Sequence, residues 1–110
     1  MSNVVNTNIR QIRVGDVEPS AIDLTRHMLP GESLTLASVV AGAGLSITSS
    51  AAIGNANAYY ARTNRVMQAD KYIQWTHTAV IASDSSYIDI QFTTSLGQTK
   101  KLRINFQVQL

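Results

Sequence analysis

The sequence predicts an all-β domain folded as an antiparallel β-sandwich, and three observations carry this prediction. Apolar and polar residues alternate with a period of two over several segments, as they do in strands with one buried face. Turn-forming residues recur about every ten positions along the 110 residues, which is typical of sandwiches and small barrels. No segment of the sequence keeps a helical period. We favour the sandwich over the small barrel.

The length and composition limit the possible functions. A chain of 110 residues supports one hydrophobic core, so we expect one domain. The formal net charge of +2 is small and the basic residues are scattered, so we expect no nucleic-acid partner. The chain has no cysteine, which fits folding in a reducing cytoplasm. Neither a signal peptide nor an apolar run long enough for a membrane span is present in the sequence, so we expect no membrane partner.

The N-terminal part of the chain is predicted to be an arm followed by an edge strand. Residues 1–8 are rich in asparagine and carry Val4 and Val5, which suits an extended, flexible arm before a domain over 9–110. A first strand is expected between Ile9 and Val17, and Pro19 is expected to break it.

One short helical or 3-10 turn is expected between Asp23 and Leu29, with Asp23 as its N-cap. In the strand that follows it we expect Leu34, Leu36 and Val40 to share one face. The elements predicted after the helical turn are a strand over 33–40, a turn over 42–44, a short strand over 45–49, a loop over 50–61, a brief strand over 63–67 and a longer strand over 72–81.

A hairpin over 87–110 is the clearest element of the sequence. Its two arms alternate strictly between apolar and polar residues, and a slip of one residue would expose every apolar side chain. Gly97 in the turn is expected to take a positive φ, which a tight hairpin requires. The side chains expected on the inner face are Ile88, Ile90, Phe92, Leu102, Ile104 and Phe106.

Sequence motifs of catalysis are absent: there is no phosphate-binding loop, nucleophile elbow, paired-histidine metal motif or acidic calcium loop. We therefore expect no enzyme, no metal and no cofactor. His27 and His77 are interpreted as surface or half-buried packing residues. Trp75 with the four tyrosines is a candidate stacking platform for sugar or single-stranded nucleic acid, although a core position for Trp75 is favoured.

A basic cluster formed by Lys100, Lys101 and Arg103 follows the hairpin turn. Two interpretations remain open for it. The cluster either meets an acidic protein surface or phosphate, or it protects an edge strand against unwanted pairing.

Two segments match short motifs. The segment at 23–34, DLTRHMLPGESL, resembles "DWSxWLxxGDxI", with Leu24 and His27 in place of the tryptophans. The segment at 92–99, FTTSLGQT, is similar to "VTTSxGRT", with Gln98 in place of the arginine. Both motifs recur in small Ig-like virion proteins of tailed bacteriophages and prophages, and the resemblance spans 23–110.

The resemblance implies an Ig-like β-sandwich and a non-enzymatic virion structural protein, made in the cytoplasm of the bacterial host. We expect a capsid decoration protein that contacts the major capsid protein or other virion proteins, as a homo-oligomer or in many copies. The alternatives are a neck, tail or baseplate subunit and, from a different class, a carbohydrate- or receptor-binding module. The candidate assembly contacts are Val4, Val5, Lys100, Lys101 and Arg103.

The predicted arm generates a first test. Residues 1–8 offer too little apolar surface to offset an ordering cost of roughly 1 to 2 kcal/mol per residue. We expect Val4 and Val5 to dock on a neighbouring subunit while the arm backbone pairs with an exposed strand edge. A chain that begins at Ile9 should therefore fold but occupy purified virions less fully than the full chain, as measured by quantitative mass spectrometry. Equal occupancy would show that the arm has no role in assembly.

Overall fold

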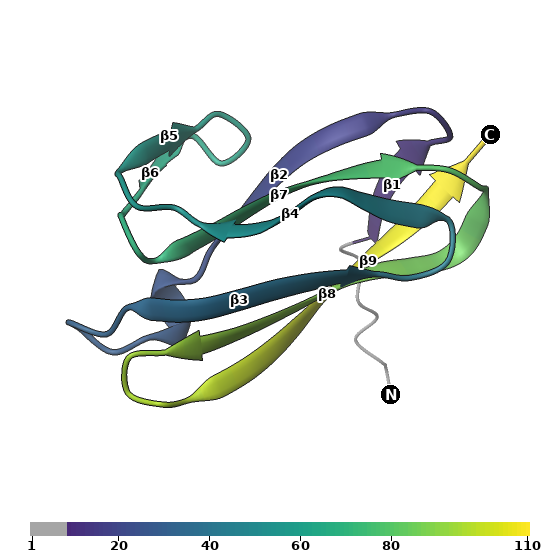
Figure 1. The fold of residues 1–110 in the computed structure, drawn as a ribbon. Helices are drawn as coiled ribbons and strands as arrows, with labels where there is room; N and C mark the ends of the chain where they lie inside the picture. The colour runs from purple at the N-terminus through teal and green to yellow at the C-terminus, as the bar shows by residue number, and fades with distance from the viewer. Residues whose placement is uncertain (1–8) are drawn as a thin grey trace, which may run out of the picture.

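Two β-sheets packed face to face make up the fold, which confirms the predicted all-β sandwich (Figure 1). The computed structural model describes residues 9–110. A single 3-10 turn, η1 (Thr25–His27), lies between the second and third strands. The strands are β1 (Ile9–Arg13), β2 (Val17–Asp23), β3 (Leu34–Ala41), β4 (Leu45–Ile53), β5 (Ala58–Tyr60), β6 (Arg65–Met67), β7 (Tyr72–Ala79), β8 (Ser83–Thr94) and β9 (Thr99–Gln109).

The strand order is that of an Ig-like domain. One sheet has the order β1-β9-β8-β3 and the other has the order β2-β7-β4. In the first sheet, β3, β8 and β9 correspond to strands C, F and G of an immunoglobulin constant-type sandwich. In the second sheet, β2, β7 and β4 correspond to strands B, E and D. The β5–β6 hairpin is an additional two-stranded unit between β4 and β7.

One strand pair departs from the antiparallel prediction, because β1 runs parallel to β9. No hairpin joins these two strands. The chain leaves β1 through a tight turn and enters β2 in the opposite sheet, so this crossover sets the direction of β1. The first sheet is therefore mixed.

The β8–β9 hairpin contributes one side of the core, as predicted. Phe92 and Phe106 are each 1% exposed, and Ile88 and Ile90 are fully buried. Leu102 and Ile104 are partly buried and pack against the same cluster. From the opposite sheet, β7 contributes the side chains of Ile73, Trp75 and Ala79 to the cluster. Trp75 is 3% exposed, which confirms its core position.

Pro19 lies inside β2, so the prediction that it breaks a strand is wrong. Leu24 donates its amide to the Lys71 carbonyl at 2.8 Å, and Ala79 donates to the Asp16 carbonyl at 3.0 Å. Hydrogen bonding alternates along an antiparallel ladder. The backbone N–H and C=O groups of the even-numbered residues of β2 therefore bond to β7, and those of the odd-numbered residues point away from β7. Pro19 occupies an outward position of an edge strand, where a missing N–H costs no ladder bond.

The prediction that Leu34, Leu36 and Val40 share one face of β3 is wrong. Leu34 is buried, but Leu36 is 67% and Val40 is 60% exposed. The register against β8 shifts between Leu34 and Leu36, and one extra residue at a bulge inverts the alternation that follows it. Ala37 and Val39 therefore pack against the core in their place.

Two predicted turns are present in the structure. The helical turn is present as η1, although the N-cap position is Leu24 rather than Asp23. The Asp23 Oδ1 atom nevertheless accepts hydrogen bonds from the Thr25 amide at 3.0 Å and hydroxyl at 2.7 Å. Gly97 has a φ of 78°, which confirms the predicted positive φ in the hairpin turn.

The core assignment of Phe106 can be tested by truncation. Phe106→Ala should lower the free energy of unfolding by about 3 to 5 kcal/mol, because it removes a buried aromatic side chain and leaves a cavity. Chemical denaturation measures the change. Gln91→Ala, on the exposed face of β8, is the control and should change stability by less than about 0.5 kcal/mol. Equal effects of the two substitutions would place Phe106 outside the core.

Candidate interaction site

The predicted assembly contacts are spread over different surfaces. Val4 and Val5, with the rest of the predicted arm 1–8, lie outside the described residues. Lys100 faces inward, and its Nζ atom donates to the His27 carbonyl at 2.7 Å. Lys101 and Arg103 point to the other face of β9, because successive side chains of a strand alternate.

Arg103 is already engaged within the domain. Its guanidinium donates to the two carboxylate oxygens of Asp89 at 2.6 and 2.9 Å, and it lies 3.9 Å from the centroid of the Tyr87 ring. Within residues 9–110, the Lys101 side chain has no hydrogen bond or ion pair and is exposed. Of the predicted basic cluster, Lys101 therefore remains the side chain most available to a partner.

The aromatic residues do not share one exposed platform. Trp75 lies in the main core and Tyr72 in a second buried cluster. Tyr87 packs beneath Arg103. A stacking surface built on Trp75 is therefore absent from the described fold.

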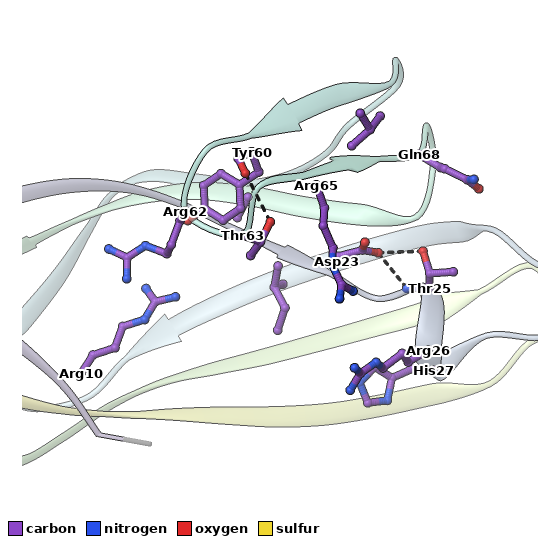
Figure 2. Close-up of a pocket in the computed structure, with 13 residues that line it drawn as sticks. Arg10, Asp23, Thr25, Arg26, His27, Tyr60, Arg62, Thr63, Arg65 and Gln68 are labelled. Carbon is purple, nitrogen blue, oxygen red and sulfur yellow. Dashed lines mark hydrogen bonds between the residues drawn. The ribbon is translucent and has the colours of Figure 1, made fainter. Parts of the chain in front are cut away.

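A basic cleft of about 780 Å³ lies between β2, η1 and the β5–β6 hairpin (Figure 2). Four arginines line it, and each comes from a different part of the chain. Arg10 belongs to β1, Arg26 to η1, Arg62 to the turn between β5 and β6, and Arg65 to β6. Because these residues are far apart in sequence, no local pattern pointed to the cleft.

The β5–β6 hairpin is held over β2 by the second buried cluster. Ala21 of β2, Met67 of β6 and Tyr72 of β7 form this cluster. The Tyr72 hydroxyl donates to the Ala56 carbonyl at 2.8 Å. A Cβ atom at Gly54 would lie 1.9 Å from the Tyr72 ring, so only glycine leaves room for this ring. These contacts fix the hairpin, and with it Arg62 and Arg65, above the edge of the sandwich.

Glu18 connects the cleft to the core. Its Oε1 atom lies 3.5 Å from Arg10 Nη1 and 3.2 Å from His77 Nε2, and its Oε2 atom lies 3.6 Å from Arg62 Nη2. Trp75 Nε1 donates to His77 Nδ1 at 2.9 Å. This pattern assigns the proton of neutral His77 to Nε2, from which it faces Glu18. His77 is 0% exposed, so its interpretation as a surface or half-buried residue is wrong.

Burial governs the protonation of this network. It lowers the pKa of His77, against the opposing effect of the Glu18 carboxylate. Burial also lowers the pKa of Arg10, and the positive charge of Arg62 adds to this effect. Two positively charged guanidinium groups repel each other beside a single carboxylate. A second negative charge near them would therefore be stabilised.

His77 generates a pH prediction. An unfolded chain protonates histidine near pH 6.5, while the folded protein resists protonation of His77 until a lower pH. The stability that neutral His77 contributes is therefore complete above about pH 6.5 and is lost as the pH falls toward the lowered pKa. His77→Gln should lower stability by about 1 to 2 kcal/mol at pH 7, because it leaves part of the imidazole space empty. It should also reduce the change in melting temperature between pH 7 and 5.

Two carboxylates with lowered pKa values do not affect the change in stability between pH 7 and 5. The neighbouring Thr94 hydroxyl and the Leu29 amide lower the pKa of Glu32, and Arg103 lowers the pKa of Asp89. Both stay ionised above pH 5. Identical pH dependence in the full chain and in His77→Gln would contradict the proposed role of His77.

In the part of the chain that the structure describes, no group of three or more His, Asp or Glu side chains is placed to hold a metal ion. None of the helical segments in residues 9–110 is long and apolar enough to cross a membrane. Comparison of the chain with protein-family models and with curated proteins finds no match.

Proposed function

We propose that this protein is a non-enzymatic structural component of a tailed-phage virion and that it decorates the capsid. Its Ig-like domain would be present in many copies, in contact with the major capsid protein. The basis is the resemblance of segments 23–34 and 92–99 to motifs of small Ig-like virion proteins.

The observation that carries the proposal is that these two segments are neighbours in the fold. Ser95 donates its amide to the Ser33 carbonyl at 2.7 Å, and Ser33 donates its amide to Ser95 Oγ at 3.0 Å. Two motifs that are distant in sequence thus form one structural unit at one end of the sandwich. If the two motifs have a common origin, we expect them to be kept together in one such unit.

The acidic position of the first motif has a structural role in this unit. Glu32 is 2% exposed, and its Oε1 atom accepts the Leu29 amide at 2.7 Å. The hydroxyl of Thr94, from the second motif, contributes most to the lowered pKa of Glu32. The Glu32 carboxylate and the Thr94 hydroxyl, one from each motif, are therefore buried as neighbours.

The replaced tryptophan positions also point inward. Leu24 is fully buried in the main core. The His27 ring packs edge-on against Phe92, with 6.2 Å between ring centroids. The side chains at both positions are therefore directed toward the core.

Edge strand β3 offers a surface suited to assembly. The bulge at its start leaves Leu36 and Val40 exposed on the outer side of the sheet. Exposed apolar side chains on an edge strand favour association with another chain. This feature agrees with a protein that works in a repeated assembly.

Immunogold labelling of purified particles of the phage that carries this gene tests the proposal. Regular labelling over the head, with many copies per particle by quantitative mass spectrometry, is the expected result. Labelling confined to the neck, tail or baseplate would favour the alternative location. Particles without the protein would rule out a virion role.

A further inference from the structure

The excess positive charge of the chain is located at the basic cleft. Two carboxylates, those of Asp23 and Glu18, lie beside its four arginines. Four positive and two negative charges leave an excess of two, which equals the net charge of +2 for the whole chain. The other five basic residues are balanced by the other five acidic residues. The cleft is therefore where the protein attracts an anionic group.

Several donors at the cleft have no partner in the described structure. Arg10 and Arg62 share the Glu18 carboxylate. Within residues 9–110, the side chains of Arg26 and Arg65 form no ion pair and no hydrogen bond. Arginine presents a planar fork of donors that matches a carboxylate. Figure 2 shows these side chains arranged around the cleft on both sides of β2.

The cleft also contains an open strand edge. β2 is the outer strand of its sheet and has no second neighbour among residues 9–110. The ladder alternation described above directs the backbone N–H and C=O groups of Ala21 and Asp23 away from β7. Both residues line the cleft, where Asp23 is exposed and Ala21 is 9% exposed beneath the β5–β6 hairpin. An extended peptide can pair with such an edge through its main chain.

We propose that the cleft binds an extended acidic segment of a partner protein. The main chain of this segment pairs with β2 at Ala21 and Asp23, and its carboxylates accept hydrogen bonds from Arg26 and Arg65. The apolar side chains of Ile22 and Val66 line the same cleft, and its volume of about 780 Å³ accommodates several partner side chains. This inference holds whether or not the protein is part of a virion.

Two other occupants fit less well. Nucleic acid is bound through a longer series of phosphate contacts than an excess of two charges supports. The chain's own residues 1–8 contain no Asp or Glu, so they supply no negative charge for the arginines. An acidic peptide satisfies the charge and the strand edge together.

Fluorescence anisotropy with the full chain tests the proposal. The probe is a fluorescein-labelled octapeptide of alternating glutamate and valine, at low ionic strength because salt screens exposed charges. A matched peptide with glutamine in place of glutamate should bind at least about tenfold more weakly. The double variant Arg26→Gln/Arg65→Gln should also weaken binding of the glutamate peptide about tenfold.

A matched control separates the cleft from overall charge. Arg13→Gln/Lys101→Gln also removes two positive charges, but from exposed positions outside the cleft. This variant should leave binding of the glutamate peptide unchanged. An equal loss in both double variants would overturn the proposal, as would undetectable binding or equal binding of the glutamine peptide. Tighter binding of an eight-nucleotide oligothymidylate, lost in Arg26→Gln/Arg65→Gln, would instead assign the cleft to nucleic acid.

Amide chemical shifts test the strand pairing separately. On addition of the glutamate peptide, the signals of Ala21 and Asp23 should move. The signals of β4, the opposite edge of the same sheet, should not move. Shifts confined to side chains of the arginines would overturn pairing with β2.

Discussion

Burial of one face of the β8–β9 hairpin against β7 is the constraint on which the rest of the sandwich depends. The two strands of this hairpin are the longest in the fold. Their inner side chains cannot be covered by a two-stranded ribbon, so a second sheet must pack on them. β1 and β3 then extend the hairpin on either side, and β2 and β4 extend β7. His77 is tolerated at this interface because Trp75 Nε1 donates to its Nδ1 atom and the Glu18 carboxylate lies 3.2 Å from its Nε2 atom.

Strict alternation made the hairpin and its inner face predictable from sequence, whereas features set by neighbouring strands were not. A proline usually breaks a strand because a central strand needs its N–H group, and the edge position of β2 removes that need for Pro19. The faces of β3 were misassigned after Leu34 because the bulge depends on pairing with β8. The direction of β1 likewise depends on a crossover between sheets. Each of these outcomes is decided by tertiary contacts that a local period does not contain.

The cleft shows the same limit for function. Its arginines span positions 10 to 65 and meet only because the β5–β6 hairpin folds back over β2. That segment was expected to be a loop at 50–61 and a brief strand at 63–67, and the fit between Gly54 and Tyr72 that fixes it has no sequence signature. The opposite error concerns Lys100, Lys101 and Arg103. These residues form a cluster in sequence, but strand alternation and the ion pair with Asp89 separate them in space.

The parallel pairing of β1 with β9 has a mechanical consequence. Ile9 lies opposite Asn105 and Arg13 lies opposite Gln109, so the start of β1 and the end of β9 are at opposite ends of the ladder. Tension applied through these two ends pulls the strands past each other in shear. The inter-strand hydrogen bonds then bear the load together, whereas a hairpin peeled from its open end would lose them one after another. The β1–β9 ladder acts as a clamp that resists extension of the domain along its own chain.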